Sequence, residues 1–322
     1  MKTVQLACQA MATRFEFVLH GEDEKSLRAA GEEVFEEIIR LEGELGFYQS
    51  ASEISRLNAG AGHHPVRVSP MLFELLEKSL ELTQQTSGAF DITVGPLMHC
   101  WGLAGGEGRF PSDDELVKAM KLVGPKNIIL DRSDYSVRYT SEGTQIDLGS
   151  IGKGYALDIA AEWLRDAGID SALIHGGTST TYAIGSPPDQ EAWRIAIVRP
   201  QDGPVLSQSG EAPEESNILA TVELRDSSLS ISAVWGKSFE LNGELYGHVV
   251  DPRTGRPVTG AYLAAVVAPS ATVTDALATA LLTLGSEGQA QLTDAFPELR
   301  MLVAEPGGES DYRVSSHGIV AN

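Results

Sequence analysis

The sequence predicts an α+β fold in one folding unit. Helix-like and strand-like patterns alternate irregularly along the 322 residues, without the regular βαβ order that predicts a parallel sheet. The chain is 42% hydrophobic and 21% charged, so it can bury one large core or two smaller ones. Because no linker clearly divides it, we expect residues 1–322 to form two interleaved lobes of one unit, with mixed or antiparallel sheets flanked by helices.

In the first half of the chain, hydrophobic periodicity predicts two long helices and three strands. Residues 15–19 alternate between apolar and polar side chains, which is typical of a strand. Apolar residues at helical spacing over 27–45 predict a long helix with a Glu-rich outer face, and residues 71–86 predict a second helix. Strand-like runs follow at 127–130 and 137–139.

In the second half, helices are predicted at 151–167 and 272–284. Strands are predicted between and around them, at 172–174, 182–184, 193–198, 220–224, 229–232, 248–250 and 263–268. The segment 201–217 is polar, acidic and turn-rich, so we expect a mobile surface insertion there. The last residues, 306–322, are rich in Gly and Ser and are expected to form a partly loose tail.

Charge and cysteine content exclude several classes of protein. With 24 Lys and Arg against 45 Asp and Glu, the net charge is −21, which opposes nonspecific nucleic-acid binding and docking on an anionic membrane. The two cysteines, Cys8 and Cys100, are too few for a disulfide framework and lack zinc-site spacing. No run approaches a membrane span, and no signal peptide precedes Cys8. We expect a cytoplasmic protein, or an exported lipoprotein or periplasmic protein if an N-terminal signal has been trimmed.

Residues 146–156, with the sequence IDLGSIGKGYA, indicate a phosphate site. An acidic residue, closely spaced glycines and Lys153 occur where a strand is predicted to lead into a helix. Residues 150–154 would then lie at the helix start, where free backbone N–H groups and the helix dipole favour an anion. The pattern is neither a P-loop nor the glycine pattern of a dinucleotide fold. The alternative is that the glycines only pack a helix against a strand.

Three further segments occur in a characteristic order. They are TSGAFDITVGPL at 86–97, HVVDPRTGRP at 248–257 and VTDALATA at 273–280. With these separations the chain resembles the ApbE family, flavin transferases that move FMN from FAD onto a threonine or serine of another protein. The resemblance extends over about residues 9–305, through residues 11–13, residues 52–58, the Gly176-Gly177 pair and the segment around Trp193. It implies a flavin site between the two lobes.

Asp275 and Thr279 predict a metal site. Residues four apart share a helix face, so this carboxylate and this hydroxyl can meet one cation, and oxygen ligands suit Mg²⁺. The alternative is that Asp275 only caps or solvates a helix start. The resemblance implies that both residues bind Mg²⁺ together with Ser150, through its backbone carbonyl. Some relatives have a second aspartate where this chain has Ala278, so one protein ligand can be missing here.

His248 is the candidate general base. By position alone, a histidine at a predicted strand end beside a turn can be merely structural. The resemblance implies instead that His248 takes the proton from the acceptor hydroxyl as it attacks phosphorus, a task that suits a side chain titrating near neutral pH. Asp251 and Arg253 are expected to stabilise the turn through hydrogen bonds and a salt bridge.

The resemblance also implies the residues that bind FAD. Ala89, Phe90 and Asp91 would line the flavin site, although the residues alone are equally consistent with a tight turn and a core phenylalanine. The remaining FAD contacts implied by the resemblance are Met11, Tyr48, Asp147, Lys153 and Val249. The chain has alanine at positions 12 and 233, where the family commonly has glycine, and each change can narrow the pocket or alter a turn.

The resulting hypothesis is a Mg²⁺-dependent FAD:protein FMN transferase. An acceptor threonine or serine, on a protein of the electron-transfer flavoprotein type, would attack the FMN-side phosphorus and expel AMP. One alternative is an FAD pyrophosphatase, in which water replaces the hydroxyl and FMN and AMP are released. The other is a flavin-binding protein without chemistry, which would have no need of His248.

Overall fold

The computed structural model describes residues 1–105, 108–199, 217–234, 238–241, 244–307 and 312–321. The insertion predicted at 201–217 lies outside these residues except for Asn217. Within the described parts, no helix is both long and apolar enough to cross a bilayer.

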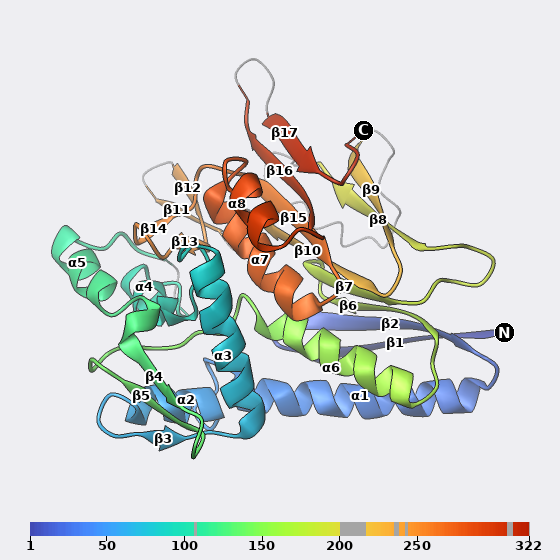
Figure 1. Ribbon diagram of the computed structural model, residues 1–322, viewed down its shortest axis with the longest axis horizontal. Helices are drawn as coiled ribbons and strands as arrows, with labels where there is room; N and C mark the ends of the chain where they lie inside the picture. The colour runs from blue at the N-terminus through green and yellow to red at the C-terminus, as the bar shows by residue number, and fades with distance from the viewer. Residues whose placement is uncertain (106–107, 200–216, 235–237, 242–243, 308–311, 322) are drawn as a thin grey trace.

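An eight-stranded antiparallel sheet forms the centre of the fold, which confirms the predicted α+β class (Figure 1). Its strand order is β1-β2-β6-β7-β10-β15-β16-β17. In that order the strands are Lys2–Ala10, Thr13–Gly21, Ser171–Gly176, Thr180–Ile184, Ser227–Ala233, Leu263–Ala268, Arg300–Pro306 and Tyr312–His317. The strands β1, β16 and β17 were not predicted. The tail expected to be partly loose from 306 contains the strand Tyr312–His317, because β17 pairs with β16.

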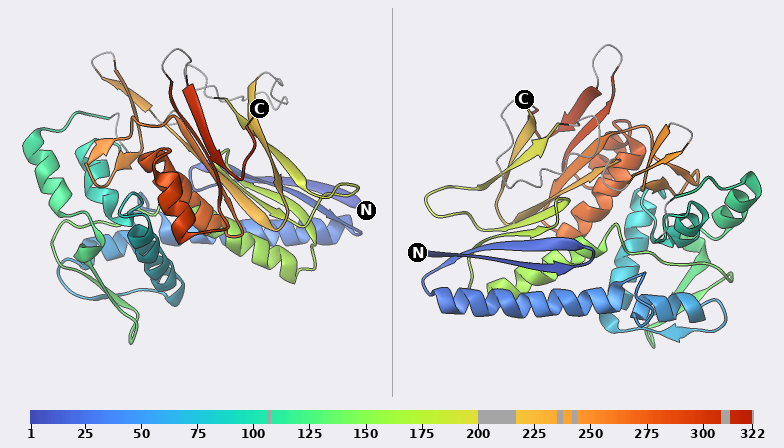
Figure 2. Two further views of the ribbon diagram at one scale, coloured as in Figure 1. Left: turned by 45° about the horizontal axis from the view of Figure 1, so that its top comes forward. Right: turned by 180° about the vertical axis from the view of Figure 1, so that it is seen from behind.

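Both faces of this sheet are covered. Helices α1 (Glu24–Leu45), α6 (Gly152–Asp166) and α7 (Ala271–Leu284) lie on one face over the main core, and α1 runs along β1 and β2 (Figures 1 and 2). The other face carries the hairpin of β8 (Trp193–Val198) and β9 (Ile218–Leu224) over a second core. Two-sided burial explains why β15 is apolar throughout: Val266 faces the first core and Val267 the second.

The second lobe lies at one end of the sheet (Figure 2). It contains α2 (Glu53–Gly60), α3 (Pro70–Gln85), α4 (Gly95–Cys100), α5 (Asp113–Lys121) and a sheet in the order β3-β5-β4, with strands Val66–Arg67, Ser136–Tyr139 and Ile128–Asp131. Two hairpins lie between β10 and β15 in sequence, β11 (Ser238–Leu241) with β12 (Glu244–Gly247) and β13 (Val250–Asp251) with β14 (Arg256–Pro257). The short helix α8 (Gly288–Ala295) follows α7.

The turn between β1 and β2 has both central residues in the left-handed region. Met11 has φ 51° and Ala12 has φ 57°, between the paired residues Ala10 and Thr13. Two-residue hairpin turns of this kind favour glycine, because a side chain in this conformation costs about 1–2 kcal/mol. The turn therefore forms with alanine at position 12, but the left-handed conformation of this residue costs energy.

Helices α6 and α7 approach each other closely at Gly154. A Cβ atom added there would lie 2.1 Å from the backbone oxygen of Ala271 and 2.8 Å from Cβ of Asp275. Neither neighbour is the end of a flexible side chain. Gly154 therefore sets the spacing between the two helices, whereas the packing alternative for these glycines placed a strand against this helix.

We predict that Gly154→Ala lowers the free energy of unfolding by about 1–3 kcal/mol, because the added methyl group forces the two backbones apart. The matched control is Gly152→Ala in the same helix, where an added Cβ meets no atom within 4 Å. That change should be neutral or stabilise by up to about 1 kcal/mol. Urea unfolding followed by circular dichroism measures both, and equal losses in the two variants would contradict this role of Gly154.

Candidate flavin and metal site

The segment that leads into α6 is held by a side chain of the second lobe. Asn58 accepts a hydrogen bond from Ile146 N at 2.8 Å and donates one to Ile146 O at 2.9 Å. Tyr139 Oη also donates to Asn58 Oδ1 at 2.7 Å. The predicted strand at this point is absent, since residues 144–148 have no strand assignment. The amide of Asn58 supplies the pair of bonds that a neighbouring strand would make.

Asp147 fixes the turn that follows. Its buried Oδ1 accepts a hydrogen bond from Gly149 N at 2.8 Å, which forms a tight turn just before α6. Its own backbone N–H donates to Ile92 O at 2.8 Å. Asp147 thus joins the start of α6 to the segment that contains Ala89, Phe90 and Asp91.

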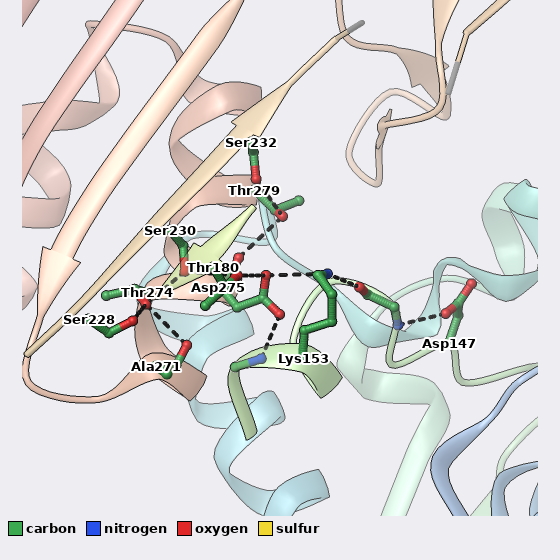
Figure 3. A network of polar contacts seen from close by, with 12 residues as sticks. Asp147, Lys153, Thr180, Ser228, Ser230, Ser232, Ala271, Thr274, Asp275 and Thr279 are labelled. Carbon is green, nitrogen blue, oxygen red and sulfur yellow. Dashed lines mark hydrogen bonds and ion pairs between the residues drawn. The ribbon is translucent and has the colours of Figure 1, made fainter. Parts of the chain in front are cut away.

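The start of α6 already has an anion, which is the carboxylate of Asp275 on α7 (Figure 3). Gly154 N donates to Asp275 Oδ2 at 3.0 Å, and Gly152 N donates to Leu148 O at 2.8 Å. Lys153 Nζ lies 3.6 Å from Asp275 Oδ1 and donates to Gly149 O at 3.3 Å. The sequence suggested that backbone N–H groups here would bind a phosphate, but those of Gly152 and Gly154 already have partners. Lys153 is the group that can move.

Hydroxyl groups complete the surroundings of Asp275, which is only 5% exposed. Thr180 Oγ1, on β7, donates to Asp275 Oδ1 at 3.3 Å. One turn along α7, Thr279 Oγ1 donates to Asp275 O at 3.3 Å and lies 3.3 Å from Ser232 Oγ at the end of β10. The proton of Thr279 is directed at a backbone carbonyl, so its lone pairs can face a cation.

The donor set around Asp275 consists of oxygen atoms. The ammonium group of Lys153 contacts both Asp275 and the carbonyl of Gly149. Ser150 is the next residue after Gly149, so this turn and Asp275 lie within reach of one lysine side chain. Among the described residues, no group of three or more His, Cys, Asp or Glu side chains could hold a metal. A cation bound to Asp275 would therefore need further ligands of another kind, such as neutral oxygens, water or a phosphate.

Ala89, Phe90 and Asp91 are more buried than a flavin-lining role requires. Phe90 is 1% exposed and belongs to the main core, which favours the alternative of a core phenylalanine. Asp91 Oδ1 accepts hydrogen bonds from Thr93 N at 2.8 Å and Thr93 Oγ1 at 2.7 Å, at the start of the short 3₁₀ helix Ile92–Val94. Burial raises the pKa of Asp91 despite these two bonds. The segment can line a ligand site through its backbone, but not through the face of the Phe90 ring.

Tyr48 is the exposed aromatic side chain beside this site. It is 64% exposed and packs edge-on against Phe47, with ring centroids 5.1 Å apart. Partial burial and the negative charge of Asp147 raise the pKa of Tyr48. Its ring is therefore available to stack on a planar ligand above Asp147.

Met11 lies at the same end of the main sheet as Thr180. The register places Ser230, Thr180, Gly176 and Phe15 in one row across four strands. The β1–β2 turn follows this row, and a Cβ on Gly177 would lie 2.2 Å from Thr13 Oγ1. Met11 thus lies at the sheet end from which Thr180 reaches Asp275.

His248 lies in a bend between β12 and β13, not in a strand as predicted. The preceding Gly247 approaches the end of β10, since an added Cβ would lie 2.7 Å from Val234 O. After it, Val258 N donates to Val249 O at 2.9 Å. His248 is half-buried and stands near the end of the strand whose Ser232 contacts Thr279.

The turn after His248 is rigid. Arg253 forms a two-pronged contact with Asp251, from Nε to Oδ1 and from Nη2 to Oδ2, each at 3.0 Å. Trp101 Nε1 donates to Gly255 O at 2.7 Å. The expected role of Asp251 and Arg253 in stabilising the turn is thus confirmed.

A pocket of about 390 Å³ adjoins this turn. Its walls come from both lobes, with Trp101 and Phe110 on one side and Thr283 of α7 on the other, and Tyr246 completes an aromatic cluster. Asp275, Lys153 and Thr279 are not among its lining residues. The pocket therefore lies against the turn that follows His248 and is not formed by the candidate metal ligands.

Two residues of the site were missed by sequence reasoning. Asn58 and Thr180 bind groups 88 and 95 residues away in sequence, so spacing alone could not reveal them. For Thr180 the available signal was the hydroxyl-rich run that follows the noted Gly176-Gly177 pair.

Comparison with known proteins supports one family. The ApbE family model matches residues 11–303. The FAD:protein FMN transferase of Treponema pallidum is 31% identical over 309 residues, covering 91% of this chain and 81% of that protein. The protein of the same name from Vibrio cholerae is 29% identical over 300 residues, covering 91% and 84%.

Solved structures agree. The crystal structure of the ApbE protein from Thermotoga maritima superposes with a TM-score of 0.85 at 25% identity, covering 98% of this chain and 97% of that one. The apo form of the Pseudomonas stutzeri flavinyl transferase ApbE gives a TM-score of 0.82 at 26% identity, covering 98% and 95%. The resemblance inferred from four motifs is confirmed, and the chain belongs to the ApbE family.

Proposed function

We propose that this chain transfers FMN from FAD to a threonine or serine hydroxyl of an acceptor protein, with Mg²⁺, and releases AMP. That it is an enzyme of the FAD:protein FMN transferase type follows from its family and from relatives of that name that match over 91% of the chain. The metal, the acceptor hydroxyl and the AMP product are the proposed part. The observation that carries them is the buried Asp275 between Lys153 and Thr279.

The residues present fit a magnesium ion. Asp275, Thr279 and the carbonyl of Ser150 are hard oxygen donors, and Mg²⁺ is commonly held by one or two carboxylates together with substrate phosphates and water. Bound there, Mg²⁺ would polarise the pyrophosphate of FAD and offset its charge. Gly154 N–H and Thr180 Oγ1 donate hydrogen bonds to the Asp275 carboxylate and hold its two oxygens in place.

The protein side chains divide the remaining work. Lys153 has a 22% exposed side chain and can turn from Asp275 to a phosphate oxygen without leaving the site. Tyr48 would stack on the flavin, with Met11, Val249 and the backbone of Ala89 to Asp91 enclosing it. Asp147 would keep the turn before α6 in place and accept a hydrogen bond from the ligand with its second oxygen.

His248 is proposed as the base. It would accept the proton of the acceptor hydroxyl at a ring nitrogen while the hydroxyl oxygen bonds to the FMN-side phosphorus and the bond to AMP breaks. The rigid turn at Asp251 and Arg253 would hold its backbone still. A fixed base and a held hydroxyl raise the effective concentration of the nucleophile over that of water.

The test of this function is whether flavin reaches a protein. Pure protein is incubated with FAD, Mg²⁺ and a threonine-containing acceptor domain of the electron-transfer flavoprotein type. We expect the acceptor to gain the mass of one FMN group through a phosphoester bond, and AMP release to rise above the slow rate with FAD alone. Fast production of free FMN with an unmodified acceptor would instead identify a pyrophosphatase.

We predict that FAD binding depends on a divalent cation and that Asp275→Asn weakens it. Removing the one carboxylate ligand should cost at least about 10-fold in apparent Mg²⁺ affinity, the lower end of what even outer partners of a metal site contribute. FAD titrations with Mg²⁺ and with EDTA measure this. Asp226→Asn, which removes a surface carboxylate paired with Arg165, is the control. Equal FAD affinity with and without EDTA would remove the metal from the site.

We predict that His248→Ala leaves FAD affinity within a few-fold but slows transfer by about 10²–10⁴, the usual contribution of a general base. His63→Ala, at an exposed histidine beside Glu142, should change neither quantity. Single-turnover transfer and FAD titration measure the two effects separately. A parallel loss of binding and rate would make His248 structural, and the base would lie elsewhere.

A further inference from the structure

Asp158 of α6 binds the start of α7 through four hydrogen bonds. Its Oδ1 accepts from Ala271 N at 2.7 Å. Its Oδ2 accepts from Ser270 Oγ at 2.7 Å, from Thr272 N at 2.9 Å and from Thr272 Oγ1 at 2.6 Å. A carboxylate of one helix therefore caps the N-terminus of another.

This contact satisfies groups that α7 cannot satisfy by itself. The first N–H groups of a helix have no partner within the helix, and the positive end of its dipole favours a negative charge. Ser270, the residue before α7, accepts from Val273 N at 3.3 Å. Asp158 takes the two N–H groups of Ala271 and Thr272, so the helix start is tied to α6 at a defined place.

Asp158 and Gly154 act from the same face of α6. They are four residues apart, so both point toward α7. Gly154 contacts α7 at Asp275 through its N–H, and Asp158 holds α7 one turn earlier. Two fixed points on one face determine both the position of α7 along α6 and its rotation about its own axis. Those two variables decide where the oxygens of Asp275 lie relative to Lys153.

A different kind of anchor joins α7 to the main sheet. Thr274 Oγ1 lies 2.9 Å from Ser228 Oγ and 2.8 Å from Ser230 Oγ of β10, as Figure 3 shows. These are contacts between neutral hydroxyl groups that can rotate and exchange donors. The charged clamp at Asp158 is the stronger and more directional restraint.

We propose that Asp158 is a positioning residue for the metal and FAD site, acting through α7 on Asp275 and Thr279. The proposal rests on the function proposed above, because it concerns the affinity of those two residues for Mg²⁺. All four hydrogen bonds of Asp158 go to residues 270–272, and it is not among the residues proposed to hold the ion or FAD. Its loss should therefore alter the affinity for the ion far more than the rate of the chemical step.

The test is the apparent Mg²⁺ dissociation constant, taken from FAD titrations at a series of Mg²⁺ concentrations. Asp158→Asn keeps the volume but cannot accept all four bonds, and we expect a rise of roughly 10-fold, the lower end for an outer partner of a metal site. At saturating Mg²⁺, transfer should return to within a few-fold of the wild-type rate. Thr272→Val removes one of the four bonds and should cause a smaller rise in the Mg²⁺ dissociation constant. This second variant tests the same contact if Asp158→Asn does not fold.

The matched control is Asp23→Asn, which removes the aspartate that accepts from Ser26 N and Ser26 Oγ at the start of α1. It should lower the melting temperature while leaving the Mg²⁺ dissociation constant unchanged. A Mg²⁺ dissociation constant for folded Asp158→Asn or Thr272→Val equal to that of the wild type would overturn the positioning role alone. Wild-type FAD binding that ignores Mg²⁺ would overturn both this inference and the proposed metal-dependent function.

Discussion

The burial of the Asp275 carboxylate is the constraint on which the arrangement of the site depends. A carboxylate that is 5% exposed is costly unless hydrogen bonds and an opposite charge compensate it. Gly154 N–H, Thr180 and Lys153 provide that compensation from α6 and β7. The site therefore forms only when the helix layer and the main sheet have both assembled around α7, which couples its geometry to the core.

The burial of Asp275 explains the residue found at position 154 and the polar residues found on α7. Position 154 must be glycine, because its N–H can reach Asp275 only if the two backbones come closer than any side chain would allow. Helix α7 is very apolar on its core side, yet it carries Thr274 and Thr279 where it meets β10. These hydroxyl groups pair with serine hydroxyls of the strand and with backbone carbonyls of α7, so the helix can be buried without leaving them unpaired.

The local pattern of apolar residues was sufficient to predict elements that bury one face at regular spacing. The spacing of Leu27, Val34, Ile38 and Leu41 gave α1 because these residues all face the main core. Strand β1 was missed although Val4, Leu6, Cys8 and Ala10 alternate correctly, since an edge strand is only partly buried and its signal is weak. Strand β17 was missed because Gly and Ser residues around it suggested a tail, whereas pairing with β16 orders it.

At the candidate flavin and metal site, prediction from the sequence had different limits. The helical spacing of Asp275 and Thr279 places both residues on one face of α7, because that relation is local. The spacing could not show that Asp275 itself would occupy the start of α6, since that contact joins residues 121 apart in sequence. Nor could pattern decide that Phe90 enters the core, because an apolar ring beside a glycine is equally suited to a pocket or to the interior.

Charge balance connects this geometry to the proposed chemistry. The chain carries a net charge of −21, and Lys153 is the cation in contact with Asp275. In this pair, one ammonium group balances one carboxylate. A doubly anionic pyrophosphate placed beside them would leave two uncompensated negative charges in a site of low dielectric, where repulsion between like charges is strong. A divalent cation supplies just that missing charge, and it uses the oxygens of Asp275 and Thr279 that the lysine alone does not fill. The pairing of Lys153 with Asp275 is thus the arrangement expected of a site that must accept both an anion and a metal, since either one alone would leave the local charge unbalanced.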